Sequence, residues 1–126
     1  MEGAGEDPYL GSKVAYARVK GFQGETVADL AKVNTIAACA KHFAAYGYVE
    51  AGLEYNIVDI SNSKLYNSVL PPFKATVDAG VRTFMNSFNT LNGVPATGNA
   101  FLQRDILKGK WKFDGFVISD YASIRE

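Results

Sequence analysis

The stretch TIAACAKHF, Thr35 to Phe43, is apolar almost throughout until Lys41 and His42 interrupt it near its end. A run of this kind, without regular polar alternation, is typical of a strand that is buried on both faces, as in a parallel sheet. Two later stretches follow the same pattern, Val81 to Phe88 and Phe116-Val117-Ile118. The sequence therefore predicts three buried strands, each with polar side chains at or near its carboxyl end.

Helical signals separate these strands. A stripe of apolar residues spaced four apart runs from Leu65 to Val77, and serine or asparagine caps stand before several of the helical stretches. We expect helices over Ser12 to Gly21, over Thr26 to Val33, after the cap Ser61 with a break and a fresh start near Pro71, and from the cap Asn99 through Gly109. A short Ile57 to Ile60 segment adds a possible fourth strand. Strand and helix thus alternate, which is the signature of parallel α/β construction.

Composition excludes several classes of protein. The charges of thirteen basic and thirteen acidic residues cancel, and the sequence has no basic run that could bind a nucleic acid. The apolar runs are far shorter than the ~20 residues of a membrane-spanning helix. One histidine and one cysteine cannot supply the three or four ligands of a usual zinc site, so neither a metal nor a cofactor is expected. The compartment stays open: no signal peptide is recognisable, and a longer parent could be periplasmic or secreted.

Polar side chains stand at or just after the carboxyl end of each predicted strand. They are the pair Lys41-His42, then Ser87 and Asn89, then Asp120. In (β/α) barrels the carboxyl ends of the strands form the face where catalytic side chains gather. A charge at such a position must face a pocket, because burying it without a partner is costly. We therefore expect these residues to open onto one pocket.

Five motifs, in this order and at these spacings, make the chain resemble glycoside hydrolase family 3 along nearly its whole length. They are Gly5-Glu6-Asp7-Pro8-Tyr9-Leu10-Gly11, Lys41-His42-Phe43, Tyr66 through Leu70-Pro71-Pro72-Phe73, Asn92-Gly93-Val94-Pro95 and Gly115-Phe116-Val117-Ile118-Ser119-Asp120-Tyr121. The resemblance implies a partial (β/α)8 TIM barrel of about three to four βα units. Residues 1–126 would then be a single partial domain, an internal fragment of the family's N-terminal catalytic barrel.

The resemblance also implies an activity and the residues that perform it. The parent would be a retaining β-glycosidase of the β-glucosidase or β-xylosidase type, acting on a β-glycoside or an oligosaccharide. Asp120 would be the nucleophile that forms a glycosyl-enzyme ester. Lys41 and His42 would hydrogen-bond hydroxyls of the sugar, contacts that can strengthen in the oxocarbenium-like transition state. Lys41 would also help keep Asp120 ionised.

Three further residues are expected near the substrate. Tyr121 would lie beside the sugar, at a position where many relatives have tryptophan. Phe88 stands where some relatives carry tyrosine, so a hydroxyl contact is lost there. Met85 completes the set, although Met85 and Phe88 also suit the filling of a barrel interior. Glu6 and Asp7 are expected to cap or brace a loop.

The second carboxyl group of a retaining glycosidase, roughly 5 to 5.5 Å from the first, is not identifiable in this chain. In the family it commonly comes from a later domain, so the missing C-terminal domain of the parent is an expected partner. A subgroup that acts on N-acetylglucosamine uses a histidine within Lys-His-Phe-Pro-Gly-His instead. Here Ala44-Ala45-Tyr46-Gly47 follows Phe43, which disfavours that subgroup. We expect the isolated chain to be inactive.

Alternative interpretations remain for the same residues. Lys41 suits a Schiff-base lysine in an aldolase-like barrel, because a strand-end lysine in apolar surroundings can have a lowered pKa. The chain also suits a truncated, non-catalytic barrel segment that binds sugar weakly or assembles with other pieces. Asp120 could cap a helix that follows its strand, and Lys41 and His42 could form a buried, satisfied polar pair.

Overall fold

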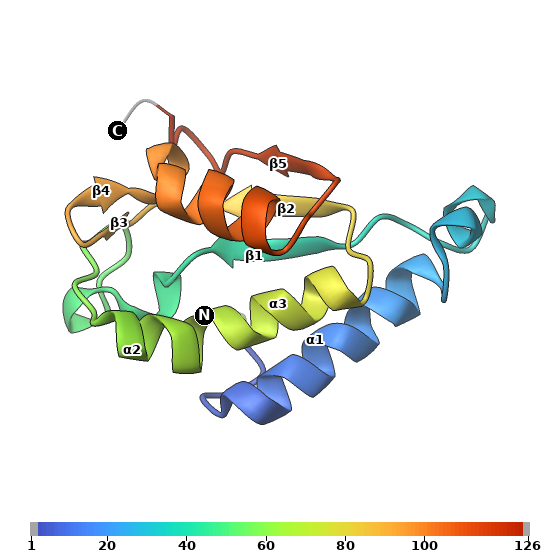
Figure 1. Ribbon diagram of the computed structural model, residues 1–126, viewed down its shortest axis with the longest axis horizontal. Coiled ribbons are helices and arrows are strands. Elements are labelled where there is room, and N and C mark those ends of the chain that lie inside the picture. The colour runs from blue at the N-terminus through green and yellow to red at the C-terminus, as the bar shows by residue number, and fades with distance from the viewer. Residues whose placement is uncertain (1–2, 125–126) are drawn as a thin grey trace.

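The computed structural model describes residues 3–124, and a parallel three-stranded sheet forms its centre (Figure 1). The strands, in their spatial order, are β1 (Cys39–Phe43), β2 (Thr83–Asn86) and β5 (Phe116–Ile118). All three run in the same direction, so their carboxyl ends share one edge. The mixed helix and strand content expected from the sequence is confirmed.

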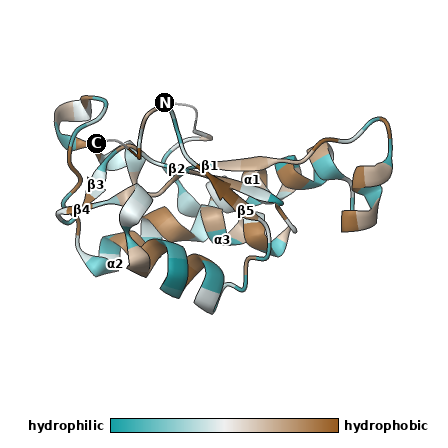
Figure 2. Ribbon diagram, turned by 90° about the horizontal axis from the view of Figure 1, so that it is seen from above, coloured by the Kyte–Doolittle hydropathy of each residue, from teal (hydrophilic) through white to brown (hydrophobic). Residues whose placement is uncertain are grey.

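One face of the sheet packs against helices and the other is open. Ala40, Phe84 and Val117 lie in register on neighbouring strands, and side chains alternate along a strand, so these three point into the core together. On the opposite face Phe116 and Ile118 are 62% and 46% exposed, and Figure 2 shows β5 as a hydrophobic strand. The prediction that the strands are buried on both faces is wrong for the described residues, because they supply a covering layer on one side only.

Helix α1 (Pro8–Gln23) and helix α3 (Leu70–Asp78) lie side by side against the sheet (Figure 1). Asp7 begins α1, since its carboxylate accepts hydrogen bonds from the backbone N–H groups of Tyr9 (2.7 Å) and Leu10 (3.0 Å). The expected start at Ser12 is therefore wrong, while the capping role expected for Asp7 is confirmed. Proline suits the first helical position because its missing N–H would be unpaired there anyway.

The chain passes through Pro71-Pro72 without the predicted break. Helix α2 (Asn62–Lys64), a π-helical turn (Leu65–Val69) and α3 follow one another with helical dihedral angles at their junctions. The Leu70 N–H bonds to the Leu65 carbonyl, five residues back, which widens the turn just before the prolines. A wider turn relieves the clash between a proline ring and the preceding turn. Ser61 caps the start as expected, accepting from the Lys64 N–H at 3.1 Å.

The remaining elements are short. They are four 3₁₀ turns (Val27–Ala31, Tyr46–Tyr48, Glu50–Gly52, Ala96–Gly98), the hairpin strands β3 (Thr90–Leu91) and β4 (Val94–Pro95), and a π-helical segment (Phe101–Lys110). Asn99 caps the last of these as expected, accepting from the Leu102 N–H. The helix expected over Thr26 to Val33 is only a 3₁₀ turn. The short strand expected near Val58 is reduced to one bridge with Leu91.

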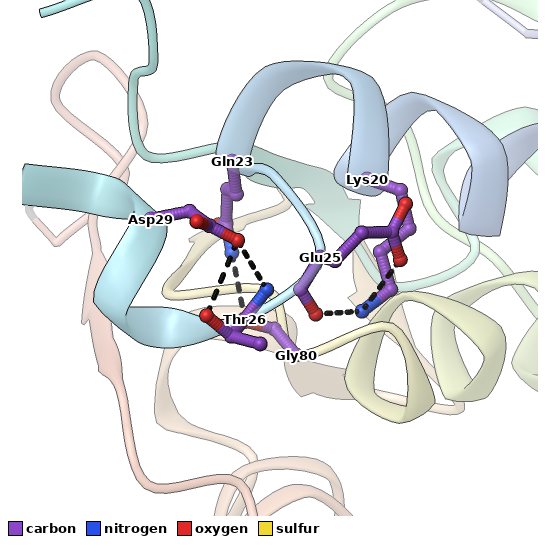
Figure 3. Close-up of polar contacts among 6 residues, drawn as sticks. All are labelled: Lys20, Gln23, Glu25, Thr26, Asp29 and Gly80. Carbon is purple, nitrogen blue, oxygen red and sulfur yellow. Dashed lines mark hydrogen bonds and ion pairs between the residues drawn. The ribbon is translucent and has the colours of Figure 1, made fainter. Parts of the chain in front are cut away.

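A buried glutamine joins α1 to the sheet. Gln23 is 3% exposed. Its Oε1 accepts from the N–H groups of Ala38 and Arg82, both at 3.0 Å. Its Nε2 donates to the Gly80 carbonyl at 2.9 Å, the bond drawn in Figure 3. Ala38 immediately precedes β1, and Arg82 immediately precedes β2. One side chain therefore sets the position of the helix relative to the starts of two strands.

A second group of polar contacts follows the end of α1. Lys20 donates to the Glu25 carbonyl at 2.6 Å, and the Asp29 carboxylate accepts from the Thr26 N–H at 2.8 Å (Figure 3). The pKa of Asp29 is lowered to about 2, mainly by a side-chain hydrogen bond from Lys32 and next by the bond from the Thr26 N–H.

None of the helices in residues 3–124 has the length and the apolar character that a bilayer-spanning helix needs.

Candidate functional site

His42, near the end of β1, and Asp120, two residues after β5, meet at the carboxyl edge of the sheet. His42 Nε2 lies 3.3 Å from Asp120 Oδ2, and the two side chains are 20% and 16% exposed. Strand β2 lies between β1 and β5, so the strand order brings the two residues together. They come together as the strand-end pattern predicts, and both still reach solvent.

The backbone that carries His42 is irregular and firmly anchored. The register between β1 and β2 shifts between Ala40 and Phe43, and the Lys41–His42 and Phe43–Ala44 peptide bonds are cis. Phe43 is fully buried, and its ring packs edge-on against the rings of Phe73 and Phe84, with centroids 5.1 and 5.3 Å away. The residue next to His42 is therefore held by the core, and the imidazole projects from a fixed backbone.

Asp120 is oriented by the turn that follows it. Its Oδ1 accepts from the N–H of Tyr121 at 2.7 Å, and its backbone carbonyl accepts from the N–H of Ser123 at 3.3 Å. A helix N-cap would instead accept, through its side chain, from the N–H two or three residues on. In the described residues the carboxylate therefore does not serve as a helix cap, and Oδ2 is left facing His42.

A cleft of about 710 Å³ opens beside His42, a volume in the range of small-molecule sites. It is lined by the N-terminal loop, the end of β1, the loop after it and α2 with its π-helical extension; Lys41, His42, Tyr46, Tyr48, Lys64 and Ser68 are among its residues. Asp120 contacts one of these lining residues, His42. Within residues 3–124, no three histidine, cysteine or carboxylate side chains are grouped as metal ligands.

A cluster of aromatic rings supports this corner of the cleft. The rings of Tyr46 and His42 meet edge-to-face at 5.4 Å, Tyr46 approaches Phe88 at 6.0 Å, and Phe88 packs on Tyr55 at 4.6 Å. Partial burial raises the pKa of Tyr46, and the negative charge of Glu54 adds to the effect. Neither Tyr46 nor Tyr55 was predicted as a site residue from the sequence; the signal that could have found them is the density of tyrosine in the loop that follows His42.

The other predicted site residues fall in different surroundings. Met85 is half-buried on β2, in register with Ile118 on the open face. Tyr121 is 85% exposed. Phe88 belongs to the aromatic cluster described above.

The polar residues that follow β2 do not face the cleft, and that expectation is corrected. Ser87 and Asn89 are both fully buried, and the Ser87 hydroxyl donates to Asn89 Oδ1. Asn89 Nδ2 also donates to the Ala44 carbonyl at 3.3 Å. These side chains are satisfied internally, and they tie the end of β2 to the loop after β1.

Comparisons with known proteins give the family. The model described as "Glycosyl hydrolase family 3 N terminal domain" matches residues 1–126. The chain is 47% identical to a periplasmic beta-glucosidase of Salmonella typhimurium over 99% of its own length, and 41% identical to a beta-xylosidase of Formosa agariphila over 94%. It spans 16% of the length of each of those two relatives.

Solved structures agree with these matches. A beta-glucosidase from Listeria innocua in complex with gluconolactone superposes with a TM-score of 0.93 at 47% identity, over 98% of this chain and 17% of that one. An exo-1,3/1,4-beta-glucanase from Pseudoalteromonas superposes with a TM-score of 0.88 at 36% identity, over 94% of this chain and 15% of that one.

Proposed function

Since the chain belongs to glycosyl hydrolase family 3, we propose that it forms a segment of the catalytic barrel of a retaining β-glycosidase. The beta-glucosidase and beta-xylosidase relatives support β-linked glucosides or xylosides as the class of substrate. The chain spans 16% of those relatives. The proposed activity therefore belongs to a longer protein that contains this segment.

The open sheet supports the proposed barrel. In a (β/α)8 barrel, parallel strands carry helices outside and apolar side chains inside. Residues 1–126 would form a single partial domain of three to four such units. Phe116 and Ile118, exposed on the face without helices, then point into the barrel interior. Further strands of the longer protein would pair with the outer edges of β1 and β5, which have no strand partner within the described residues.

The nucleophile in this proposal is Asp120. One carboxylate oxygen attacks the anomeric carbon, the bond from that carbon to the leaving oxygen breaks, and a glycosyl-aspartate ester forms; water then hydrolyses the ester. The proton for the leaving oxygen comes from a second carboxyl group, which we place outside residues 1–126. The observation that carries the assignment is the 3.3 Å approach of His42 Nε2 to Asp120 Oδ2 at a solvent-accessible strand edge.

The neighbouring residues bind the sugar in this proposal. Lys41 and His42 line the cleft and can hydrogen-bond to sugar hydroxyls. Hydrogen bonds of this kind help catalysis when they strengthen as the ring distorts toward the transition state. Tyr121, directly after the nucleophile, would pack against the sugar, and Met85 and Phe88 would contribute to the wall.

A chimaeric enzyme tests the proposal. Residues 1–126 replace the matching segment of the Listeria innocua beta-glucosidase, which superposes closely on this chain. We expect hydrolysis of an aryl β-glucoside or β-xyloside, and a loss of about 10⁴-fold or more in kcat for Asp120→Asn. A 2-deoxy-2-fluoro glycoside should label Asp120, which mass spectrometry of the digested protein identifies.

Asp114→Asn is the matched control, because Asp114 is an exposed carboxylate paired with Arg82 at 2.8 Å, six residues before the proposed nucleophile. It should leave kcat within about threefold of the unsubstituted chimaera, as expected of a surface change. Label on another residue, or full activity in Asp120→Asn, would overturn the proposal.

A further inference from the structure

The proposed function assigns no role to Tyr46 and Tyr55, two members of the aromatic cluster of Tyr46, Tyr55 and Phe88. Two of its members come from the loop after β1 and the third from the segment after β2. Tyr46 is the member that reaches the site, because the edge-to-face contact with the His42 ring is made by its ring, at 5.4 Å and an interplanar angle of 68°. Phe88 contacts both tyrosine rings, with centroids 6.0 Å from Tyr46 and 4.6 Å from Tyr55.

We propose that Tyr46 is a positioning residue: its ring fixes the plane of the His42 imidazole so that Nε2 faces the Asp120 carboxylate. This inference rests on the function proposed above. An imidazole joined to its backbone by two rotatable bonds adopts several rotamers unless its ring is packed. Edge-to-face packing is directional. A tyrosine ring at this place therefore restricts His42 to the orientation that the 3.3 Å contact requires.

Tyr46 is itself held in place. Asn89 Nδ2 bonds to the Ala44 carbonyl at 3.3 Å, and the Tyr48 N–H bonds to the Ala45 carbonyl at 2.9 Å, so the backbone on both sides of Tyr46 is tied down. The Glu50 N–H bonds to the Ile57 carbonyl at 3.0 Å and closes the loop. Tyr46 thus lies on a loop that is fixed by hydrogen bonds, and its ring packs against Phe88.

The electrostatics agree with this geometry. Burial is the main cause that raises the pKa of Tyr46, and the charge of Glu54 adds to it. The charge of Asp120 contributes in the same direction, which places the phenol within electrostatic reach of the proposed nucleophile. Tyr46 therefore stays neutral through the pH range in which glycosidases work, and it acts through its ring.

Variants of the chimaeric enzyme test the inference. Because a misplaced catalytic contact can cost on the order of 10²-fold, we expect Tyr46→Ala to lower kcat by about 10- to 100-fold while KM changes by less than about threefold. Tyr46→Phe keeps the ring and should restore kcat to within about threefold of the unsubstituted chimaera. Tyr46→Leu keeps bulk without an aromatic edge, is the milder variant if Tyr46→Ala does not fold, and should resemble Tyr46→Ala.

The control is Tyr66→Ala, which removes an exposed tyrosine of the π-helical turn Leu65–Val69, whose ring centroid lies 6.4 Å from that of Phe101. It should leave kcat unchanged. A crystal structure of the Tyr46→Ala chimaera should show His42 Nε2 further from Asp120 Oδ2 than 3.3 Å.

The outcomes separate the two proposals. If the unsubstituted chimaera is inactive, or its label is not on Asp120, the proposed function fails. If it is active and labelled there, yet Tyr46→Ala keeps its kcat, the positioning role alone fails. A rise in KM without a loss of kcat would make Tyr46 a substrate contact, and an equal loss of kcat in Tyr46→Phe would assign the effect to the hydroxyl group; either result overturns the inference.

Discussion

At the residue scale, the Gln23 side chain makes hydrogen bonds to three backbone groups. Gln23→Leu keeps most of the volume but leaves the N–H groups of Ala38 and Arg82 and the Gly80 carbonyl without that partner. Each buried polar group left unpaired costs about 1–3 kcal/mol. We therefore expect a loss of about 3 kcal/mol or more in the free energy of unfolding, measured by urea titration followed by circular dichroism.

Asn67→Leu serves as the control for that experiment. It also replaces an amide by an isobutyl group, on an exposed surface where the amide donates to the Ser63 hydroxyl at 3.2 Å. Surface substitutions of this kind stay within about 0.5 kcal/mol. Equal stability of the two variants would contradict the role given to Gln23.

Asp29 provides a pH-dependent test at the same scale. Its pKa is lowered from 3.8 to about 2, first by the side-chain hydrogen bond from Lys32 and next by the Thr26 N–H. The ionised form therefore favours the folded state, so this contribution is complete above pH 3.8 and is lost as the pH falls through about 2. The difference in Tm between the natural chain and Asp29→Asn should shrink from pH 5 to pH 2. A constant difference would show that Asp29 does not act through its charge.

At the scale of single elements, Gly115 lets β5 approach β2. A Cβ at this position would lie 2.1 Å from the Arg82 carbonyl oxygen and 2.6 Å from the ring of Phe113. Gly115→Ala must therefore push apart two strands whose pairing delivers Asp120 to His42. Overpacking costs about 1–3 kcal/mol, and we expect a loss in the upper part of that range by urea titration.

Gly21→Ala is the matched substitution. Gly21 lies within α1, and a Cβ there meets nothing within 4 Å. Alanine in a helix interior is favoured over glycine by about 0.5–1 kcal/mol, so this variant should be more stable than the natural chain. A Gly115→Ala chain as stable as Gly21→Ala would mean that the strands do not meet as described.

The helices show how far local patterns predict an element. The apolar stripe from Leu65 to Val77 located its helix, and Ser61 marked its start. The break predicted at the prolines was wrong. The free-energy cost of an interior proline applies to a regular α-helical turn, whereas a π-helical turn before Pro71 relieves the clash between the proline ring and the preceding turn. At α1 the opposite holds: the helix expected from Ser12 begins at Pro8, the position in a helix where proline fits best.

At the scale of the whole molecule, residues 3–124 place helices on one face of the sheet only. The proposed reaction also needs an acid from outside this chain. We therefore expect no turnover of an aryl β-glucoside by the 126-residue chain, under conditions in which the chimaeric enzyme is active. Turnover by the isolated chain that disappears in Asp120→Asn would contradict this, and would require the proton donor to lie within residues 1–126.

Hydrophobic runs, caps and strand-end polar residues are local properties, so they were enough to predict three parallel strands and most helices. The family was indicated by the resemblance of five sequence motifs. Which strand-end residues meet is not a local property. His42 and Asp120 are adjacent because β1 and β5 flank β2 in a common direction, while Ser87 and Asn89, equally polar and equally placed, are buried inside. The position of Tyr46 beside His42 likewise depends on the packing of the loop after β1 against the segment after β2. Only the tertiary structure decides such contacts. They depend on strand order, register and side-chain direction, and these result from the packing of segments that are far apart in the sequence.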